Sequence, residues 1–500
     1  MASTQPKKCL LRIQKDDREK LERLIFQRYP AKEWGCFFRF GFRRTSWGLA
    51  ASFVSMERPQ PGDLDRSSPV TVFRSRYILR AHHIVEDGPL AAGVIHSHPR
   101  GFDTFASPSD DDMDDYYGRE FYRYGKGKPY LSIIFARDDD GKFYFTGRVF
   151  DGDEWYPVTE LLTIGDALER ENAQVTFEEI ADTSGKNSYD IRETATARLE
   201  NLLGRAASKR LASAKIAILG CSGTGSPVAH VLARAGVQRF VLVDPQNISP
   251  SNLERLHGSR FEDAFALVPP PKVAIVSRMI KEINPNTEIL SIQGNVLDDL
   301  VLDALLDCDL ILGCGDSHHC RAALGDLASH YLLPSIDVAV AMRAKDGQLK
   351  IQMVEICRHV PQLPCPFCLG RIDQKILSYE LMSDDEREWR KQAAKEAETR
   401  GVDGSQYWGG EPPQELTVGY LTTLAGSMVA GYAQNLLTGS ARMPHQRFQF
   451  DVGWTKLGVA PIEGKRQLEC SCGKTLGLGD QGKADRSVSR PSHWPQPVII

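Results

Sequence analysis

The sequence predicts an α/β protein in which an N-terminal α+β domain precedes a doubly wound, Rossmann-like domain. An apolar run, Lys215–Leu219, leads into a glycine loop, Gly220–Gly225, and then into a helical pattern, which indicates the second domain. Alternating apolar strands up to Val54, and a buried strand over 91–95 that ends at two histidines, indicate the first. A chain of 500 residues, 42% hydrophobic and 25% charged, is long enough for two or three ordinary globular domains.

Composition and charge exclude several classes of protein. The net charge of −4 gives no basic footprint, so we expect no nucleic-acid partner. Residues 1–15 lack the apolar run of a signal peptide, and polar residues interrupt the apolar segment 417–437, which predicts a buried amphipathic helix and no membrane span. Eleven cysteines without an export signal point to thiols or metal rather than disulfides. A cytoplasmic location is expected.

The glycine loop has the features of a phosphate-binding turn. Glycines let the backbone approach a phosphate closely, and free N–H groups at the following helix N-terminus face the anion. The next strand, 239–243, ends at Asp244, at a spacing where a carboxylate can hold ribose hydroxyls. Ser222, however, stands where a dinucleotide fingerprint has its middle glycine. On the loop alone, a hydride-transfer enzyme remains an alternative.

Four polar residues after Asp244 favour a different chemistry. They are Asn252, Arg255, Lys272 and Asp316. Lys272 opens a predicted helix, and Asp316 follows an apolar strand, 310–312. A dehydrogenase has no need of such a set beside its pyrophosphate, whereas an enzyme that splits ATP between its α- and β-phosphates must meet the charge on the departing pyrophosphate with cations.

Taken together, these motifs resemble the ThiF/MoeB adenylating enzymes and the related ubiquitin-activating enzymes, over roughly residues 190–475. The matching residues are Gly220, Gly223, Gly225, Asp244, Asn252, Arg255, Lys272, Asp316 and Arg321. The resemblance implies that Asp244 holds the ribose of ATP. It implies that Asn252, Arg255 and Lys272 grip the phosphates and that Asp316 holds Mg²⁺. It also implies a homodimer, in which Arg192 or Arg198 of an approach helix over 191–210 can reach the partner's site; either arginine can equally be a solvated surface residue.

A second constellation lies in the N-terminal domain. His96 and His98 are separated by one residue at the end of a strand, so both imidazoles project to the same side and can share one metal ion. Three aspartates, Asp110, Asp111 and Asp112, follow. Two histidines and a carboxylate leave a fourth position for water, which is typical of a catalytic zinc site.

The order of a glutamate, His-x-His-Pro and Ser-x-x-Asp resembles the JAMM metalloproteases, which cut isopeptide bonds to ubiquitin-like proteins. The zinc ligands that the resemblance implies are His96, His98 and Asp110. Glu33 would be the general base, and Ser107 would steady the oxyanion. Two alternatives remain: Asp112, paired with Ser109, in place of Asp110, and Glu57 in place of Glu33.

Two cysteine pairs predict a structural zinc site, because four thiolates suit tetrahedral zinc. The cysteines are Cys365, Cys368, Cys470 and Cys472. The related adenylating enzymes usually have Cys-x-x-Cys in the second pair, so the shorter Cys-x-Cys is a departure. The segment 377–413 between the pairs contains no cysteine where ubiquitin-activating enzymes often keep a nucleophile. We therefore expect the reaction to end at the acyl-adenylate or to use a thiol elsewhere, with Cys357 the least implausible internal one.

These patterns together divide the chain and give it a function. The predicted parts are a JAMM-like metalloprotease domain (1–162), a linker (163–190), a ThiF/MoeB-like adenylyltransferase domain (191–475) and a disordered tail (476–500). We expect a bifunctional enzyme that adenylates the C-terminal carboxylate of a ubiquitin-like protein with ATP·Mg and processes or deconjugates that protein. A conjugating enzyme would be a further partner, as in prokaryotic ubiquitin-like conjugation and antiphage defence. The alternatives are sulfur-carrier activation for cofactor or siderophore biosynthesis, and a nucleotide-binding scaffold with inactive sites.

Overall fold

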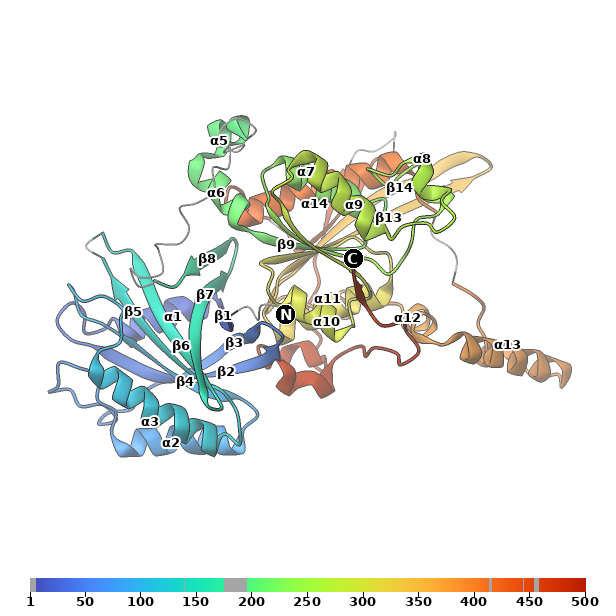
Figure 1. Cartoon of the computed structure of the whole chain (residues 1–500). Coiled ribbons are helices and arrows are strands. Elements are labelled where there is room, and N and C mark those ends of the chain that lie inside the picture. Colours follow the sequence, from blue (N-terminus) through green and yellow to red (C-terminus); the bar gives the residue numbers. More distant parts are fainter. Residues whose placement is uncertain (1–5, 139, 175–195, 413–415, 444, 454–457) are drawn as a thin grey trace. The chain divides into compact units, whose positions relative to one another are not determined.

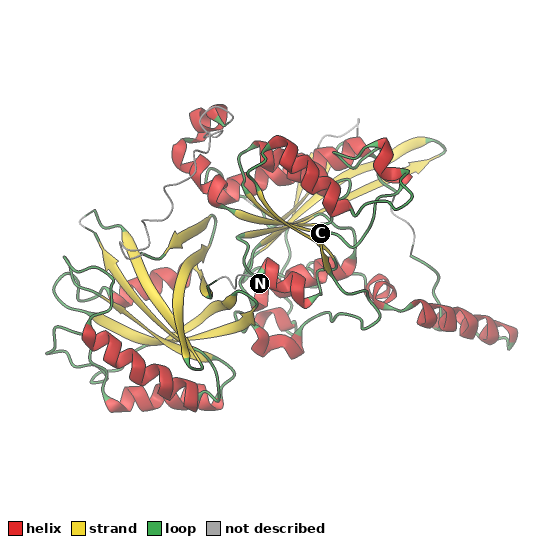
Figure 2. Cartoon of the chain, viewed as in Figure 1, coloured by secondary structure: helices red, strands yellow, loops and turns green. Residues whose placement is uncertain are grey.

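The computed structural model describes residues 6–138, 140–174, 196–412, 416–443, 445–453 and 458–500 (Figure 1). The chain forms two compact units, each with its own sheet and helices (Figure 2). Unit 1 comprises Met1–Glu193, Ala328–Leu333 and Gly473–Asp485, and unit 2 comprises Thr194–Leu327, Pro334–Cys472 and Arg486–Ile500.

Unit 1 is built on an eight-stranded sheet. Its strands are β1 (Lys8–Gln14), β2 (Trp34–Thr45), β3 (Gly48–Glu57), β4 (Ala91–Ser97), β5 (Tyr130–Arg137), β6 (Phe143–Asp151), β7 (Glu154–Ile164) and β8 (Leu168–Asn172). They pair in the order β1-β3-β2-β4-β5-β6-β7-β8, and β1 also pairs with β7. The sheet therefore closes on itself through β1.

Three helices cover the two faces of this sheet: α1 (Lys15–Ile25), α2 (Ser75–Asp87) and α3 (Pro108–Tyr124). Successive side chains of a strand point to opposite faces. Accordingly, Phe38 of β2 packs in one core with Leu21 of α1, whereas its neighbour Phe37 packs in a second core with Tyr77 of α2 and Phe121 of α3. Helix α1 thus covers one face, and α2 and α3 lie together on the other (Figure 1).

The first domain does not end at 162 as predicted. Strand β7 continues to Ile164, and β8 adds a further antiparallel strand up to Asn172. Glu169, Arg170 and Glu171 give β8 a polar composition, and Arg170 pairs with Glu160 of β7. A polar edge strand lacks the apolar alternation by which strands are recognised, so the sequence pattern predicted a linker where β8 forms.

Unit 2 is built on a nine-stranded sheet. Its strands are β9 (Lys215–Leu219), β10 (Arg239–Val243), β11 (Glu288–Gln293), β12 (Leu310–Gly313), β13 (Ser335–Lys345), β14 (Gln348–His359), β15 (Arg447–Asp451), β16 (Gly458–Ile462) and β17 (Val498–Ile499). Strands β11, β10, β9, β12 and β13 are parallel neighbours in that order, β14 to β16 continue antiparallel, and β17 joins β11 at the other edge. Because β10 and β12 flank β9, the strand order reverses beside β9, where ligands of such sheets bind.

The α-helices of unit 2 are α5 (Ala197–Leu203), α6 (Arg205–Ser213), α7 (Gly225–Arg234), α8 (Phe261–Ala264), α9 (Lys272–Ile283), α10 (Asp299–Leu305), α11 (His318–His330), α12 (Gln374–Leu381), α13 (Asp384–Thr399) and α14 (Gly419–Thr438). Those that pack against the sheet cover both of its faces (Figure 1). Figure 1 shows α7, α9 and α14 on one side and α10 and α11 on the other. Helix α14 confirms the predicted buried helix near 417–437. Among the helices in the described ranges, none has the length and apolar character needed to cross a membrane.

The approach helix and the tail differ from the predictions. The helix expected over 191–210 is two helices, α5 and α6, that meet at Gly204. Arg192 lies outside the described residues, whereas Arg198 is the second residue of α5. The tail is ordered: β17 pairs with β11, and the Ser487 backbone N–H donates to Asp326 Oδ2 at 2.8 Å. Its Gly, Ser and Pro content predicted disorder, but an open sheet edge offers unpaired backbone groups that a short strand can satisfy.

Another part of the same tail belongs to unit 1. The short helix Asp480–Asp485 and the residues before it lie along β2, where Gly479 forms a bridge with Phe42. The Phe42 backbone N–H donates to Gln481 Oε1 at 3.1 Å, and Arg43 pairs with Asp480 at 3.1 Å. Residues near the C-terminus thereby complete the hydrogen bonding of an N-terminal strand.

Candidate nucleotide site and metal clusters

The glycine loop of unit 2 lies where the strand order reverses. Gly220, which directly follows β9, has φ +89°, and a Cβ atom there would come within 2.8 Å of the Gly315 backbone nitrogen. A Cβ on Gly225 would come within 1.9 Å of the Gly220 carbonyl oxygen. The turn therefore requires glycine at both positions, and it holds the end of β9 against the residues that follow β12.

Asp244 ties the end of β10 to this loop. Its buried carboxylate accepts hydrogen bonds from the Cys221 N–H at 2.7 Å and the Gln246 N–H at 2.9 Å. Burial raises the pKa of Asp244, the Lys272 ammonium opposes this rise, and Asp316 adds to it. The carboxylate thus lies within electrostatic reach of both Lys272 and Asp316.

The predicted cations surround the same loop. Buried Lys272, the first residue of α9, donates from Nζ to Gln246 Oε1 at 2.6 Å. Arg255 lies over the loop, since a Cβ on Gly223 would be 3.0 Å from Arg255 Cδ, and its guanidinium donates to the Thr417 carbonyl at 3.0 Å. Gln246 was missed from the sequence, although its position two residues after Asp244 was a signal.

The three remaining predicted residues of this site lie in different places. Exposed Asp316 follows Gly315, which contacts Gly220, so it stands at the loop. The buried Asn252 side chain accepts from the Ser249 N–H at 3.0 Å and so shapes the turn before Arg255. Arg321 faces elsewhere: its Nε lies 3.5 Å from Asp337 Oδ2 in the protein interior.

In unit 1, His96, His98 and Asp110 come together as predicted, with possible ligand atoms within 4.8 Å of one another. All three are buried. His96 Nε2 lies 3.4 Å from Asp110 Oδ1, and His98 Nε2 lies 3.7 Å from Asp110 Oδ2. His98 Nδ1 is 2.5 Å from the Asp103 carbonyl oxygen, so the Nδ1–H form leaves Nε2 free to face the cluster.

The electrostatics of this cluster are those of a cation site. Burial alone raises the pKa of Asp110, but the neighbouring His96 and His98 hold it well below its usual range. Burial lowers the pKa of His98, and Asp110 outweighs this effect and raises it. Among the described residues, His96 Nδ1 is buried without a hydrogen-bond partner, and His96 Nε2 has only the Asp110 carboxylate, at 3.4 Å. A buried polar group without a partner calls for an explanation, and a bound metal supplies one.

Glu33 lies beside this cluster. It directly precedes Trp34, which pairs with Ser97 across β2 and β4, and its carboxylate contributes to the raised pKa of His98. The Thr71 backbone N–H donates to Glu33 Oε2 at 2.9 Å. Glu57, the alternative base, pairs with Arg39 at 3.0 Å on the opposite strand.

Ser107 and Asp110 begin helix α3 as a reciprocal cap. Ser107 Oγ donates to Asp110 Oδ2 at 2.7 Å and accepts from the Asp110 N–H at 3.3 Å. The cap turns the Asp110 carboxylate toward the histidines, whereas Asp112 is exposed. Geometry therefore favours Asp110 over Asp112. The predicted role of Ser107 in steadying an oxyanion stays a prediction.

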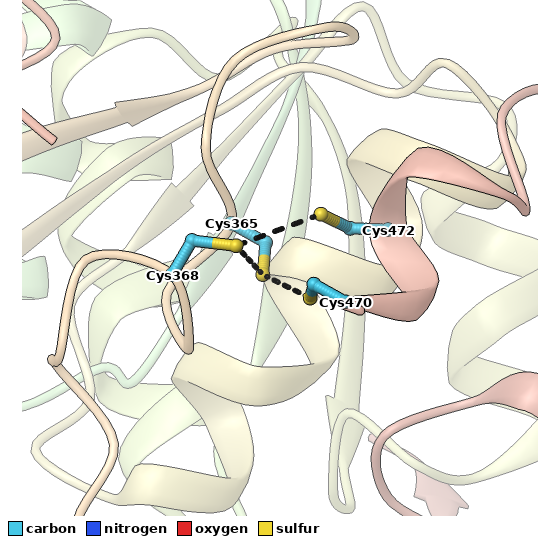
Figure 3. Close-up of side chains that lie close together, drawn as sticks. All are labelled: Cys365, Cys368, Cys470 and Cys472. Atoms are coloured by element: carbon cyan, nitrogen blue, oxygen red, sulfur yellow. Dashed lines mark hydrogen bonds between the residues drawn. The ribbon is translucent and has the colours of Figure 1, made fainter. Parts of the chain in front are cut away.

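The four cysteines of unit 2 also come together (Figure 3). Cys365 Sγ lies 3.7 Å from Cys368 Sγ and 3.5 Å from Cys470 Sγ, and the Sγ atoms of Cys368 and Cys472 are 3.9 Å apart. Zinc–sulfur bonds of about 2.3 Å in a tetrahedron place sulfurs roughly 3.8 Å apart. The Cys-x-Cys spacing suffices because a short 3₁₀ turn, Ser471–Gly473, brings Cys472 back toward Cys470.

The doubly wound sheet, with a glycine loop where its strand order reverses, defines unit 2 as a Rossmann-type α/β domain. The chain belongs to the ThiF family, whose model matches residues 195–472. Residues before 195 lie outside that match, so the JAMM resemblance of unit 1 stays a prediction from its residues.

Individual relatives share only part of the chain. The adenylyltransferase and sulfurtransferase uba4 of Emericella nidulans is 33% identical over 144 residues, which are 28% of this chain and 28% of uba4. The sulfur carrier protein ThiS adenylyltransferase of Escherichia coli is 29% identical over 109 residues, 22% of this chain and 42% of the relative. The crystal structure of E. coli MccB covers 58% of this chain and 74% of MccB at 16% identity and a TM-score of 0.42. The chain thus spans less than half the length of these two curated relatives.

Proposed function

We propose that unit 2 uses ATP and Mg²⁺ to adenylate the C-terminal carboxylate of a small ubiquitin-like or sulfur-carrier protein. One observation carries the proposal: Arg255, Lys272 and Asp316 lie around one glycine loop. The Asp244 carboxylate accepts a hydrogen bond from the backbone of that loop. Membership of the ThiF family supports it. Relatives named for sulfur transfer and for ThiS favour a sulfur carrier over a conjugated ubiquitin-like protein.

Each side chain has capacity for its proposed role. A carboxylate has about four acceptor positions, so Asp244 can accept ribose hydroxyls while it holds Cys221 and Gln246. An ammonium has three donors, so Lys272 can bind a phosphate without releasing Gln246. Asn252 and Arg255 would share the phosphates, and Asp316 would hold Mg²⁺.

In the proposed reaction, the carboxylate oxygen of the carrier attacks the α-phosphate and pyrophosphate leaves. Negative charge grows on the departing group, and Lys272 and Arg255 meet it from fixed positions. Mg²⁺ would add charge neutralisation when bound. Fixed cations in a partly desolvated site act more strongly than ions in water.

The test is ATP–pyrophosphate exchange in the presence of candidate carrier proteins. Lys272→Ala should reduce exchange by roughly 10²–10³-fold, the effect of removing one preorganised group that stabilises the transition state. Lys281→Ala is the matched control, because Lys281 lies on the same helix but donates to the Pro285 carbonyl on the surface. Exchange that persists in Lys272→Ala would refute the phosphate assignment.

We further propose that Cys365, Cys368, Cys470 and Cys472 bind a structural zinc ion in unit 2. The support is that the four sulfur atoms lie together at spacings close to those of a tetrahedral zinc site. A homodimer and a conjugating enzyme remain predicted partners.

A second function, that of a zinc metalloprotease, is favoured in unit 1 by one observation: two buried histidines converge on a buried aspartate beside a glutamate. His96, His98 and Asp110 would hold Zn²⁺, which supplies Lewis-acid activation when bound. Glu33 would accept the proton of the attacking water, and the substrate would be a precursor or conjugate of the same carrier.

Cleavage of a linear carrier fusion tests this second function. Glu33→Gln should reduce the rate by about 10²–10⁴-fold, the usual contribution of a general base, with bound zinc unchanged. Glu57→Gln is the control, since Glu57 faces Arg39 rather than the histidines. Normal cleavage by Glu33→Gln would place the base elsewhere.

A further inference from the structure

Three polar side chains of unit 2 form a hydrogen-bonded chain next to the nucleotide site. Ser317 Oγ lies 3.3 Å from His319 Nε2, and His319 Nδ1 lies 2.9 Å from Glu380 Oε2. A serine on one imidazole nitrogen and a carboxylate on the other is the arrangement that activates a serine as a nucleophile. Serine–base distances are often somewhat long without a substrate.

The serine occupies a favourable place in the fold. It lies between the end of β12 and the start of α11, at the carboxyl edge of the parallel sheet. Nucleophilic serines of hydrolases occupy the same kind of strand–turn–helix connection, with backbone N–H groups nearby. Ser317 Oγ also accepts the Cys320 N–H at 3.4 Å, so the same side chain caps the N-terminus of α11. Ser317 also directly follows Asp316, the proposed Mg²⁺ ligand.

Glu380 of α12 fixes the orientation of the histidine. Its two carboxylate oxygens accept the backbone N–H groups of His318 and His319, each at 2.9 Å, in addition to the His319 ring. Burial raises the pKa of Glu380, but the His319 ring and these two N–H groups lower it overall, which keeps the carboxylate ionised. An ionised acceptor at Nδ1 leaves Nε2 to take a proton from the serine.

The end of the chain covers the histidine. The Trp494 ring meets the His319 ring edge-on, with centroids 5.0 Å apart. Arg490 holds this segment by donating to the Trp494 carbonyl at 2.9 Å and by pairing with Asp298. An imidazole packed in this way keeps one orientation and is partly shielded from water.

We propose that Ser317, His319 and Glu380 form a catalytic triad that accepts the acyl group of the activated carrier. Resting on the proposed adenylation, the step begins when Ser317 Oγ attacks the carbonyl carbon of the acyl-adenylate. The Oγ–C bond forms, the bond from that carbon to the phosphate oxygen breaks, and AMP leaves as an anion. The serine proton passes to His319 Nε2 and then to solvent. The product is an ester between the carrier and Ser317.

The thiols near this site are less suited than Ser317 to attack the acyl-adenylate. The segment 377–413 contains no cysteine. Burial raises the pKa of Cys320 to about 12, so this thiol stays protonated at neutral pH. A protonated buried thiol is a poor nucleophile.

Labelling with a fluorophosphonate, which reacts covalently with activated serines, tests the triad without ATP or carrier. Full-length protein should be labelled at Ser317, with the modified peptide identified by mass spectrometry. Labelling should be lost in Ser317→Ala and should slow by about 10²-fold or more in His319→Gln. Ser213→Ala, which changes an exposed serine on α6, should label as the wild type does.

Two further measurements separate this triad from a structural cap and from the proposed adenylation. Ser317→Asn retains a helix-capping side chain, so lost labelling in this folded variant indicates lost nucleophile rather than lost structure. With carrier and ATP, intact-mass analysis of the wild type should show a carrier adduct that resists thiols and is cleaved by hydroxylamine. If the wild type is not labelled, the triad is refuted even where pyrophosphate exchange succeeds. If exchange fails but Ser317 is labelled, the adenylation proposal fails and the activated serine stands.

Discussion

The two candidate metal sites differ in ligand type, in ligand number and in what stands beside them. In unit 1, two histidines and an aspartate converge, and a fourth protein group, Glu33, lies next to them without belonging to the ligand set. In unit 2, four cysteines surround one point. If zinc binds, the first set would leave a coordination position for a reacting molecule, whereas the second would fill the coordination of the metal with protein ligands.

This difference predicts how each site should respond to metal removal and to substitution of its residues. A closed cysteine site contributes to folding, so its loss should unfold the surrounding structure. An open site contributes to chemistry, and the sheet of unit 1 has two hydrophobic cores of its own to hold it together. Variants of the two sites should therefore separate stability from activity.

The largest expected effect is that of Cys470→Ser. Loss of one thiolate should release zinc from unit 2 and lower its stability by several kcal/mol, since zinc binding at such sites contributes on the order of 10 kcal/mol. Zinc content and thermal unfolding measure both effects. Glu469→Gln, at an exposed neighbouring position, is the control and should keep metal and stability. If Cys470→Ser melts like the wild type, the cysteine site is not structural and the contrast fails.

A pH series should sharpen the contrast in metal-free unit 1. The pKa of His98 is raised above its ordinary 6.5, so the folded state binds a proton more tightly than the unfolded state. That stability is fully present below pH 6.5 and is lost as the pH rises through the raised pKa. In chelator-treated protein, the unfolding transition of unit 1, followed separately from that of unit 2, should show a decline in stability between pH 6 and 8 that His98→Gln removes. His83→Gln, at an exposed site on α2, should leave the decline in place.

The smallest effect is expected from Ser107→Ala. Loss of a helix N-cap costs about 1 kcal/mol of stability. Because Ser107 also orients Asp110, zinc affinity should fall by roughly 10-fold or more, as for other groups that support a metal ligand. Ser109→Ala, an exposed serine in the same turn, is the control for competitive zinc titration. Unchanged affinity would mean that the cap does not support the site.

Much of both sites could be predicted because their residues lie close together in sequence or at the ends of predicted strands. His96 lies near the end of β4, His98 directly follows that strand, and Gly220 directly follows β9, so the local pattern predicted their positions in the fold. The preference for Asp110 over Asp112 agrees with the observed cap at Ser107.

Other features depend on contacts that no local pattern encodes. Glu380 lies 61 residues from His319, and nothing in the sequence around either residue announces their hydrogen bond. Strand β17 forms because β11 has an open edge, which a Pro- and Ser-rich composition does not reveal. Arg321 was grouped with the nucleotide residues by the family resemblance, but its guanidinium lies beside the buried Asp337 carboxylate.

The route of the tail has a consequence for any attempt to divide this protein. Residues 473–485 complete β2 of unit 1, and residues 486–500 then rejoin unit 2. A single cut after residue 174 would leave the N-terminal fragment without the segment 473–485, whose side chains bind Phe42 and Arg43. The two halves are interleaved along the polypeptide, so a gene truncated between them would encode an incomplete first half rather than a free-standing enzyme.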